Sequence, residues 1–368
     1  MKRIVLLALL SLCIGTGARA QWGRPKTAND SLVSVEALPG NKVALRIYAP
    51  EAEKVSFSGD IWGARVEFTK DDRGVWEGIL ENVNPGAYRY HFVVDGVNVY
   101  DPKAPEASET SAVMKIDPDG DAFWAIKDVP HGAVAQRWYW SETLGTMRRM
   151  HVWTPPGYET STDKLPVFYL IHGGGDTDNS WPGVGCAGFI LDNLYAEGKI
   201  VPMVVVMPNG SIATDTLEGE VPLFTQDLLT SIIPYIESNY RVLTDKDNRA
   251  IGGLSMGGME TLDAGLNHYE LFGWQLVLSS GWFPNQTEFY AERGEYLKKI
   301  AQDYNDKVNL LYFTQGGPED IAYGNCKEML GLFDAAGVKY EYSEMPGGHS
   351  WHVWRNNLHD LAPLLFRK

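Results

Sequence analysis

The sequence predicts an α/β domain with a mainly parallel sheet, preceded by a small all-β sandwich. From about residue 138 onwards, apolar runs of strand length alternate with segments of helical periodicity, which favours a parallel sheet covered by helices on both faces. Between about residues 30 and 117, short runs of alternating apolar and polar residues recur, with turn signals between them. A third observation is the glycine-flanked serine of residues 253–257, which lies between strand-like and helix-like sequence.

The first twenty residues have the pattern of a secretory signal peptide. Met1-Lys2-Arg3 is a basic start, residues 4–14 form an apolar run, and Ala18-Arg19-Ala20 is a small-residue cleavage signal. The apolar run is too short to span a bilayer. We therefore expect residues 1–20 to be removed and the protein to be exported to the periplasm or the extracellular space, without membrane insertion.

The mature chain is strongly acidic. Its formal net charge of −15 becomes −18 when Lys2, Arg3 and Arg19 leave with the signal peptide. Such a surface argues against nucleic acid or an anionic membrane as a partner, and it disfavours a strongly anionic substrate. An apolar content of 44% is ample for two hydrophobic cores.

Two cysteines, Cys186 and Cys326, remain after processing. Two cysteines do not make a disulfide scaffold. In an oxidising compartment they would either form one bridge or stay as two unpaired thiols, and the sequence leaves both alternatives open.

Residues 21–127 are expected to form the all-β domain. The run of residues 88–94 alternates and is closed by the Asp95-Gly96 turn, as expected of a strand in an antiparallel sandwich. The segment from residue 117 to 137, rich in Asp, Gly, Pro and Ala, is the natural linker. Further strands of the same kind are expected at residues 43–48, 55–58 and 75–79.

The stretch "LRIYAPEAEKVSFSGDIWG…GVWEGILENVNPGAYRYHFVVDGVNVYDP" resembles the early-set modules of carbohydrate-binding module family 48. The resemblance covers about 90 residues and implies an immunoglobulin-like sandwich. Trp62 and Trp76 are candidates for stacking on sugar rings. The alternative is packing in the core, which the position of Trp76 inside a strand favours.

Residues 128–368 are expected to form the α/β domain. Because ligands of such sheets bind beyond the carboxyl ends of the strands, we expect the functional residues in the loops that leave those ends. Strands are expected at residues 147–154, 167–171, 203–207, 249–252, 275–278 and 308–313, and helices at 188–198, 224–239 and 354–366.

The motif Gly253-Leu254-Ser255-Met256-Gly257 predicts a nucleophile elbow. A sharp turn from strand to helix needs glycines on either side, so that the serine takes a strained backbone conformation with its hydroxyl lifted clear of the sheet. The N-terminus of the following helix then points at any oxyanion formed there, and we assign the N–H of Met256 as one oxyanion donor.

A glycine loop, His172-Gly173-Gly174-Gly175, follows the expected strand at residues 167–171. Such a loop exposes backbone N–H groups with no side chain in the way. We assign the N–H of Gly174 as the second oxyanion donor and give His172 a structural role. The alternative for these glycines is a tight turn from strand to loop.

Two further loops supply an acid and a base. Asp320, with Glu319 as the alternative acid, follows the strand that ends at residue 313, and His349 lies in a glycine loop before the last helix; His352 is assigned to packing or capping. The order Ser255, acid, histidine is that of α/β-hydrolases. In this arrangement the serine attacks an acyl carbonyl and the histidine takes its proton. No spacing of histidines and carboxylates indicates a metal site, and no cofactor is expected.

The second domain resembles the esterase D-like branch of carbohydrate esterase family 1, which contains feruloyl and acetylxylan esterases. By this resemblance Ser255, Asp320 and His349 fall on the triad positions and Met256 on an oxyanion position. The matching marks extend over about 220 residues and are "YLIHGGGDTDNSW", "VVVMPNG", "IGGLSMGG", "FGWQLVLSSGW", "GGPEDIAY" and "PGGHSWHVWRNNL".

The resemblance implies a secreted serine esterase that removes feruloyl (hydroxycinnamoyl) groups from xylan or a related plant cell-wall polysaccharide. Feruloylated or acetylated xylan oligosaccharides are the expected partners. An aromatic acyl group would suit a pocket walled by aromatic side chains. The candidates for substrate contact are Trp181, Trp351, Phe224 and Trp282.

Other functions remain open at this point. An acetylxylan esterase would use the same machinery, and an acyltransferase would pass the acyl group to an alcohol in place of water. A siderophore esterase of the enterochelin type also pairs a β-domain with this kind of hydrolase, but its iron-loaded substrate is anionic and fits an acidic chain poorly. A non-catalytic carbohydrate-binding protein on a hydrolase scaffold is disfavoured by the intact order of the triad.

Overall fold

The computed structural model describes residues 25–61, 63–104, 106–214, 216–283 and 287–367. The expected signal peptide (residues 1–20) and Trp62 lie outside these residues. By contacts between residues, the chain divides into two compact units. The first comprises the residues up to Val83 together with Tyr90–Ala104, and the second comprises Asn84–Arg89 together with Pro105–Lys368. Residues 105–127, which the sequence-based division places with the β-domain, thus cluster with the second unit.

The first unit is built from antiparallel strands. One sheet has the order β1-β2-β5-β4, and its inward side chains, such as Val43 and Leu45, are fully buried. Trp76 is 8% exposed and its Nε1–H donates to the carbonyl of Ala49 at 3.0 Å, so it is a core residue and offers no surface for a sugar. The strands of this sheet are β1 (Val35–Leu38), β2 (Lys42–Tyr48), β4 (Thr69–Lys70) and β5 (Val75–Leu80).

One boundary between the two units falls within a strand of the second sheet, β6 (Gly86–Val94), between Arg89 and Tyr90. From Tyr90 onwards β6 pairs with β3 (Val55–Gly59), and its last residues pair with β7 (Val97–Val99). The first residues of β6, up to Arg89, belong to the second unit. Two strands that follow also belong there and pair with each other: β8 (Glu106–Ala107) and β9 (Ala112–Ile116).

An eight-stranded sheet forms the centre of the second unit, with the order β10-β11-β13-β12-β14-β15-β16-β17. The first two strands form an antiparallel hairpin at one edge, and the remaining six are parallel. The strands are β10 (Ala133–Ser141), β11 (Thr146–Thr154), β12 (Val167–Ile171), β13 (Val204–Pro208), β14 (Arg249–Leu254), β15 (Trp274–Leu278), β16 (Leu310–Gln315) and β17 (Glu341–Glu344).

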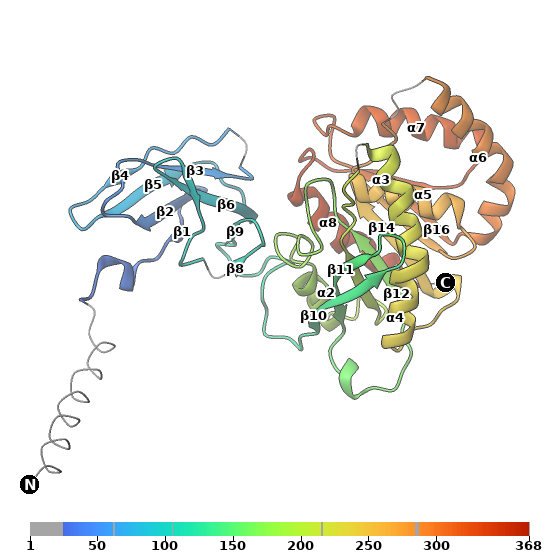
Figure 1. The fold of residues 1–368 in the computed structure, drawn as a ribbon, viewed down its shortest axis with the longest axis horizontal. Helices are drawn as coiled ribbons and strands as arrows, with labels where there is room; N and C mark the ends of the chain where they lie inside the picture. Colours follow the sequence, from blue (N-terminus) through green and yellow to red (C-terminus); the bar gives the residue numbers. More distant parts are fainter. Residues whose placement is uncertain (1–24, 62, 105, 215, 284–286, 368) are drawn as a thin grey trace, which may run out of the picture. The chain divides into compact units, whose positions relative to one another are not determined.

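Helices cover both faces of this sheet (Figure 1). Along β12, Phe168 and Leu170 pack in the core under α2 and α8, whereas Tyr169 and Ile171 pack in the core under α3 and α4. This alternation of apolar residues on both faces is what a buried parallel strand requires. The helices are α2 (Ala187–Ala196), α3 (Leu217–Asp227), α4 (Ile233–Asn239), α5 (Met256–Asn267), α6 (Thr287–Lys307), α7 (Tyr323–Ala336) and α8 (Trp351–Leu361).

The predicted fold, an α/β-hydrolase with an all-β sandwich before it, is confirmed. Two helices differ from the predicted ones. The single helix expected over residues 224–239 is α3 and α4 joined by a π-helical turn, Leu228–Ile232. Pro222 lies inside α3, and Pro234 lies in the first turn of α4. The last helix begins at Trp351, three residues earlier than expected, and ends at Leu361.

The cysteines do not form a disulfide bond. Cys186 and Cys326 are both free and buried, one in the core under α2 and the other in the core under α7, so the alternative of a bridge is wrong. Burial raises the pKa of Cys326 to about 11, which keeps its thiol protonated.

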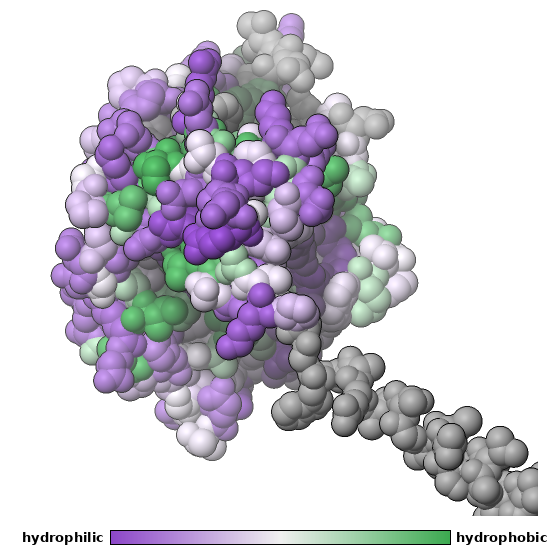
Figure 2. Space-filling view, turned by 90° about the vertical axis from the view of Figure 1, so that its left-hand side faces the viewer, coloured by the Kyte–Doolittle hydropathy of each residue, from purple (hydrophilic) through white to green (hydrophobic). Residues whose placement is uncertain are grey.

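Hydrophilic residues dominate the face of the molecule shown in Figure 2, where apolar residues form small separate groups. Among the helices of the described segments, none combines the length and the hydropathy that crossing a bilayer requires.

Candidate active site

Ser255 lies in a sharp turn between the end of β14 and the start of α5. Its backbone has φ 52° and ψ −115°, a region that non-glycine residues rarely adopt. The chain passes so close to itself here that a β-carbon at Gly253 would lie 2.4 Å from the carbonyl oxygen of Gly257. A β-carbon at Gly257 would in turn lie 2.4 Å from the carbonyl oxygen of His172. Neither flanking position has room for a side chain, so both must be glycine. The turn is the predicted nucleophile elbow.

The structure brings Ser255, His349 and Asp320 together from three different loops. His349 Nε2 lies 3.0 Å from Ser255 Oγ, and His349 Nδ1 lies 2.8 Å from Asp320 Oδ1. The loops follow the carboxyl ends of β14, β16 and β17, which explains why residues so distant in the chain meet. The His349 side chain is 17% exposed, so a substrate can reach the outer end of this chain of hydrogen bonds.

The environment of Asp320 keeps its carboxylate charged. Burial would raise its pKa, but hydrogen bonds from His349 and from the N–H of Ala322 outweigh burial, so the pKa lies below the ordinary value. The N–H of Gly316 donates to its other oxygen at 3.2 Å. A charged acceptor at Nδ1 holds the imidazole with its proton there, which leaves Nε2 free to accept the proton of Ser255.

Glu319, the alternative acid, points elsewhere. Its Oε1 accepts a hydrogen bond from the N–H of Gly347 at 3.2 Å, in the loop that carries His349. Backbone hydrogen bonds, from its own N–H and from that of Gly347, lower the pKa of Glu319. Glu319 therefore anchors the histidine loop, while Asp320 contacts the imidazole.

The glycine loop after β12 lies against the elbow. A β-carbon at Gly173 would lie 3.2 Å from that of Ser255, and a β-carbon at Gly174 would lie 4.0 Å from that of Met256. Met256 is the first residue of α5, so its N–H has no acceptor within the helix. The structure thus places both predicted oxyanion donors beside the serine, and their role stays a prediction.

His172 fixes the start of this loop from within. It is 1% exposed, and the N–H of Gly210 donates to its Nε2 at 2.9 Å. Nε2 also lies 3.0 Å from Asn209 Oδ1, and Nδ1 lies 2.8 Å from the carbonyl oxygen of Gly173. Both ring nitrogens are thus used for structure, as expected of this residue.

Two ion pairs, which were not predicted, hold the far side of the same loop. Asp178 receives two hydrogen bonds from Arg149, at 2.8 and 2.7 Å, and lies 2.8 Å from His151 Nδ1. Burial would raise the pKa of Asp178, but these partners outweigh it and lower the pKa to about 2. Asp176 pairs with Arg89 at 2.5 Å. Ion pairs therefore hold the loop at both of its aspartates. The sequence signal for them was their position close behind the glycines, in Gly175-Asp176-Thr177-Asp178.

Residues 141–365, more than half of the chain, match the sequence model of the esterase family. The chain belongs to this esterase family. Residues 33–118 match carbohydrate-binding module 48, the isoamylase N-terminal domain. The predicted combination of an esterase like those of carbohydrate esterase family 1 with a family 48 module is thereby confirmed.

Individual relatives agree with the family. An endo-1,4-β-xylanase/feruloyl esterase of Xylanibacter ruminicola is 34% identical over 339 residues, which cover 88% of this chain and 44% of that protein. This esterase thus spans less than half the length of that relative. A solved ferulic acid esterase is 26% identical with a TM-score of 0.54, covering 64% of this chain and 97% of its own. The enterobactin esterase of Shigella flexneri covers 90% of this chain and 95% of its own with a TM-score of 0.64, but at 17% identity it supports the fold alone.

The aromatic residues predicted to contact substrate are buried in the esterase. Trp181 and Phe224 are 1% and 0% exposed, and the indole N–H of Trp181 donates to the carbonyl of Ile171 at 3.0 Å. These two are core residues with no surface left for a substrate, so their prediction was wrong. Trp282 and Trp351 are each 5% exposed and also pack in hydrophobic cores. The sequence shows that these side chains are aromatic, but whether they are buried depends on which helices and loops pack against them.

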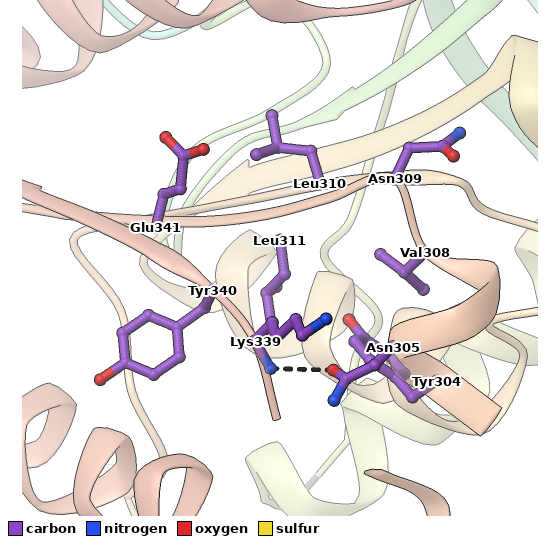
Figure 3. A pocket seen from close by; sticks show the side chains of 9 residues that line it. All are labelled: Tyr304, Asn305, Val308, Asn309, Leu310, Leu311, Lys339, Tyr340 and Glu341. Carbon is purple, nitrogen blue, oxygen red and sulfur yellow. Dashed lines mark hydrogen bonds between the residues drawn. The ribbon is translucent and has the colours of Figure 1, made fainter. Parts of the chain in front are cut away.

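The pocket shown in Figure 3 is not the candidate active site of the esterase. It has a volume of about 440 Å³ and lies at the amino ends of β16 and β17, opposite the strand ends that carry the triad. The N–H of Lys339 donates to Asn305 Oδ1 across it at 2.9 Å (Figure 3). Within the described segments, no cluster of three or more histidine, cysteine or acidic side chains is arranged to hold a metal ion.

Glu260 is an isolated buried carboxyl group of the esterase. It lies on α5, just after the elbow, is 0% exposed, and neither of its oxygens has a hydrogen-bond partner among the described residues. Burial raises its pKa well above the ordinary value, and the neighbouring charge of Glu220 adds to this effect. The folded protein therefore keeps the proton on Glu260 up to a higher pH than the unfolded chain does.

Replacing Glu260 with glutamine is therefore expected to stabilise the esterase at higher pH. The folded state keeps the Glu260 proton at pH values where the unfolded chain has lost it, so unfolding releases a proton and stability falls as pH rises. The slope is about 1.4 kcal/mol per pH unit between about pH 4.3 and the raised pKa. Glu260→Gln removes this slope, as denaturant titrations at about pH 5 and about pH 8 will show. The control is Glu292→Gln on the exposed side of α6; an equal effect of Glu260→Gln at both pH values would contradict the inference.

Proposed function

We propose that this esterase is exported and hydrolyses feruloyl (hydroxycinnamoyl) esters of xylan or a related plant cell-wall polysaccharide through an acyl-enzyme. The observation that carries the proposal is the continuous chain of hydrogen bonds from Ser255 through His349 to Asp320, at 3.0 and 2.8 Å. Export is supported by the N-terminal sequence pattern.

The chemistry follows from the positions of these groups. Ser255 Oγ attacks the ester carbonyl while His349 Nε2 takes the hydroxyl proton. The N–H groups of Met256 and Gly174 donate hydrogen bonds to the carbonyl oxygen and stabilise the negative charge that forms on it. Loss of one such donor typically costs about 2.7–4 kcal/mol of transition-state stabilisation. His349 then protonates the leaving sugar hydroxyl, and a water molecule releases the acid from Ser255 by the same steps.

The choice of substrate rests on the relatives and on charge. The similar protein of Xylanibacter ruminicola is named as both a xylanase and a feruloyl esterase, and a similar solved structure is a ferulic acid esterase. The module that matches family 48 supports a polysaccharide as the carrier of the ester. An iron-loaded siderophore is anionic, and a chain with a formal net charge of −15 is a poor partner for it.

Hydrolysis of three esters by the same purified protein tests the proposal. We expect release of ferulate from methyl ferulate and from feruloylated arabinoxylan, with slower release of acetate from acetylated xylan and little cleavage of a catecholate siderophore. Acid release is measured by chromatography, with heat-denatured protein as the blank. Release of acetate without ferulate would overturn the proposed acyl group while leaving the esterase chemistry intact. Preferred cleavage of the siderophore would overturn the proposed carrier as well.

A further inference from the structure

Two half-exposed tryptophans stand side by side on the edge strand β10. Trp138 is 53% exposed and Trp140 is 51% exposed, whereas Tyr139 between them is 2% exposed. Because side chains alternate along a strand, both indoles lie on the same face of the sheet, about 6.6 Å apart along the strand. Met147, which is paired with Trp140 across the hairpin and is 50% exposed, widens the apolar surface. We name Trp138, Trp140 and Met147 the indole platform.

The indole platform lies at the level of the carboxyl ends of the parallel strands, where the catalytic loops begin. In the hairpin, Trp138 pairs with Arg149 and Trp140 pairs with Met147. The next residue of β11, Met150, pairs with Pro208, which is the last residue of β13. The platform is therefore beyond the carboxyl end of β13, and the loops with Ser255, Asp320 and His349 leave the parallel strands at that same edge.

One side chain joins the platform to the oxyanion loop. The guanidinium carbon of Arg149 lies 5.8 Å from the ring centre of Trp138. The same guanidinium holds Asp178, in the loop that contains Gly173 and Gly174, with two hydrogen bonds. A molecule lying on Trp138 is thus separated from the loop of the candidate active site by a single residue.

The charge of the region selects a neutral occupant. Arg149 is the basic residue beside the platform, and it is paired with both Asp178 and Glu109. An anionic ligand would have to compete with these two carboxylates and with the acidic surface of the chain as a whole. The faces of the indole rings, by contrast, carry partial negative charge and attract the weakly positive C–H groups of a pyranose ring.

We propose that Trp138 and Trp140 bind the neutral main chain of the polysaccharide by stacking on its pyranose rings, and so hold the ester-bearing side group near Ser255. This inference rests on the proposed function, since it extends the site for a polysaccharide ester along its carrier. Exposed apolar patches such as the indole platform mark sites of interaction with another molecule. The alternative occupant, a second copy of the chain, is an outcome of the test below.

The test uses xylan from which all esters have been removed, so that binding is measured without catalysis. We expect the double variant Trp138→Ala, Trp140→Ala to bind this xylan at least about tenfold more weakly than the natural chain in affinity electrophoresis, because two stacking contacts are lost. Trp140→Ala alone, which leaves the ring beside Arg149 in place, is expected to show part of the loss. Ile126→Ala, which removes a 62% exposed side chain outside the hairpin, is the control and is expected to bind xylan normally.

Catalysis gives a second readout. For the double variant, kcat/KM for feruloylated arabinoxylan is expected to fall about tenfold further than kcat/KM for methyl ferulate. Equal binding of de-esterified xylan by the natural chain and the double variant would overturn the inference. So would a dimer in sedimentation that the double variant dissociates, since a second copy would then occupy the platform. If xylan binds through the tryptophans but no ferulate is released, the proposed function fails and the platform stands.

Discussion

Replacing Ser255 with alanine is expected to lower kcat for ester hydrolysis on the order of 10⁶-fold. The reason is that Ser255 Oγ, 3.0 Å from His349 Nε2, is the atom that would form the acyl-enzyme, and an alanine methyl group cannot replace it. What activity remains would come from the oxyanion donors acting on water. The measurement is kcat on methyl ferulate with purified protein, at substrate concentrations well above KM.

A matched serine controls for the loss of a hydroxyl group in general. Ser238 lies on the exposed side of α4, and its hydroxyl donates to the carbonyl of Pro234 at 2.7 Å, outside the three loops that carry the triad. Ser238→Ala is expected to keep full activity. Full activity in the Ser255→Ala variant would contradict the acyl-enzyme mechanism and leave the protein without its proposed nucleophile.

Replacing Asp320 with asparagine is expected to lower kcat about 10⁴-fold. The carboxylate of Asp320 accepts the Nδ1–H of His349 at 2.8 Å and is kept ionised by its hydrogen bonds. An asparagine amide can donate a hydrogen bond to Nδ1, which stabilises the imidazole tautomer with its proton on Nε2, and that tautomer cannot take the proton of Ser255. The same substitution also removes the negative charge that stabilises the imidazolium. The loss is measured as kcat on methyl ferulate.

The neighbouring carboxylate provides the matched control. Glu319→Gln changes the same charge one residue away, but Glu319 contacts the N–H of Gly347 and not the imidazole. We expect this variant to lose much less activity than Asp320→Asn. A larger loss with Glu319→Gln would assign the acid to Glu319 and would contradict the arrangement seen in the structure.

The fold and the meeting of the triad could be predicted because they depend on chain order. Residues in loops that leave the carboxyl ends of parallel strands gather at one edge of the sheet, whatever the intervening sequence is. For this reason Ser255 and His349 could be assigned before any coordinates were known. Chain order placed the acid at residues 319–320 and the resemblance to carbohydrate esterase family 1 favoured Asp320. Glu319 stayed open as the alternative, because adjacent residues of an irregular loop point in different directions.

The sequence could not predict which aromatic side chains are buried or which distant residues form ion pairs. Trp181 and Phe224 were recognisable as apolar, but which of the aromatic side chains are covered depends on how the elements pack. The pairing of Arg149 with Asp178 joins residues 29 positions apart, and no local pattern marks it. Strand β10 was missed because most of its side chains are exposed on both faces, so it lacks the alternation that reveals a half-buried strand.

The course of β6 bears on how a protein of this architecture can be divided or recombined. The region that matches the family 48 module ends at residue 118, yet Asn84–Arg89 and the chain from residue 105 onwards cluster with the esterase. Within that cluster, Arg89 pairs with Asp176 and Glu109 pairs with Arg149. A catalytic fragment that began after residue 118 would lack Arg89, which pairs with Asp176 of the glycine loop, and Glu109, which pairs with Arg149. We therefore expect a recombinant protein to keep these ion pairs only when it contains both modules. The boundary between the two family matches does not coincide with a boundary between the structural units.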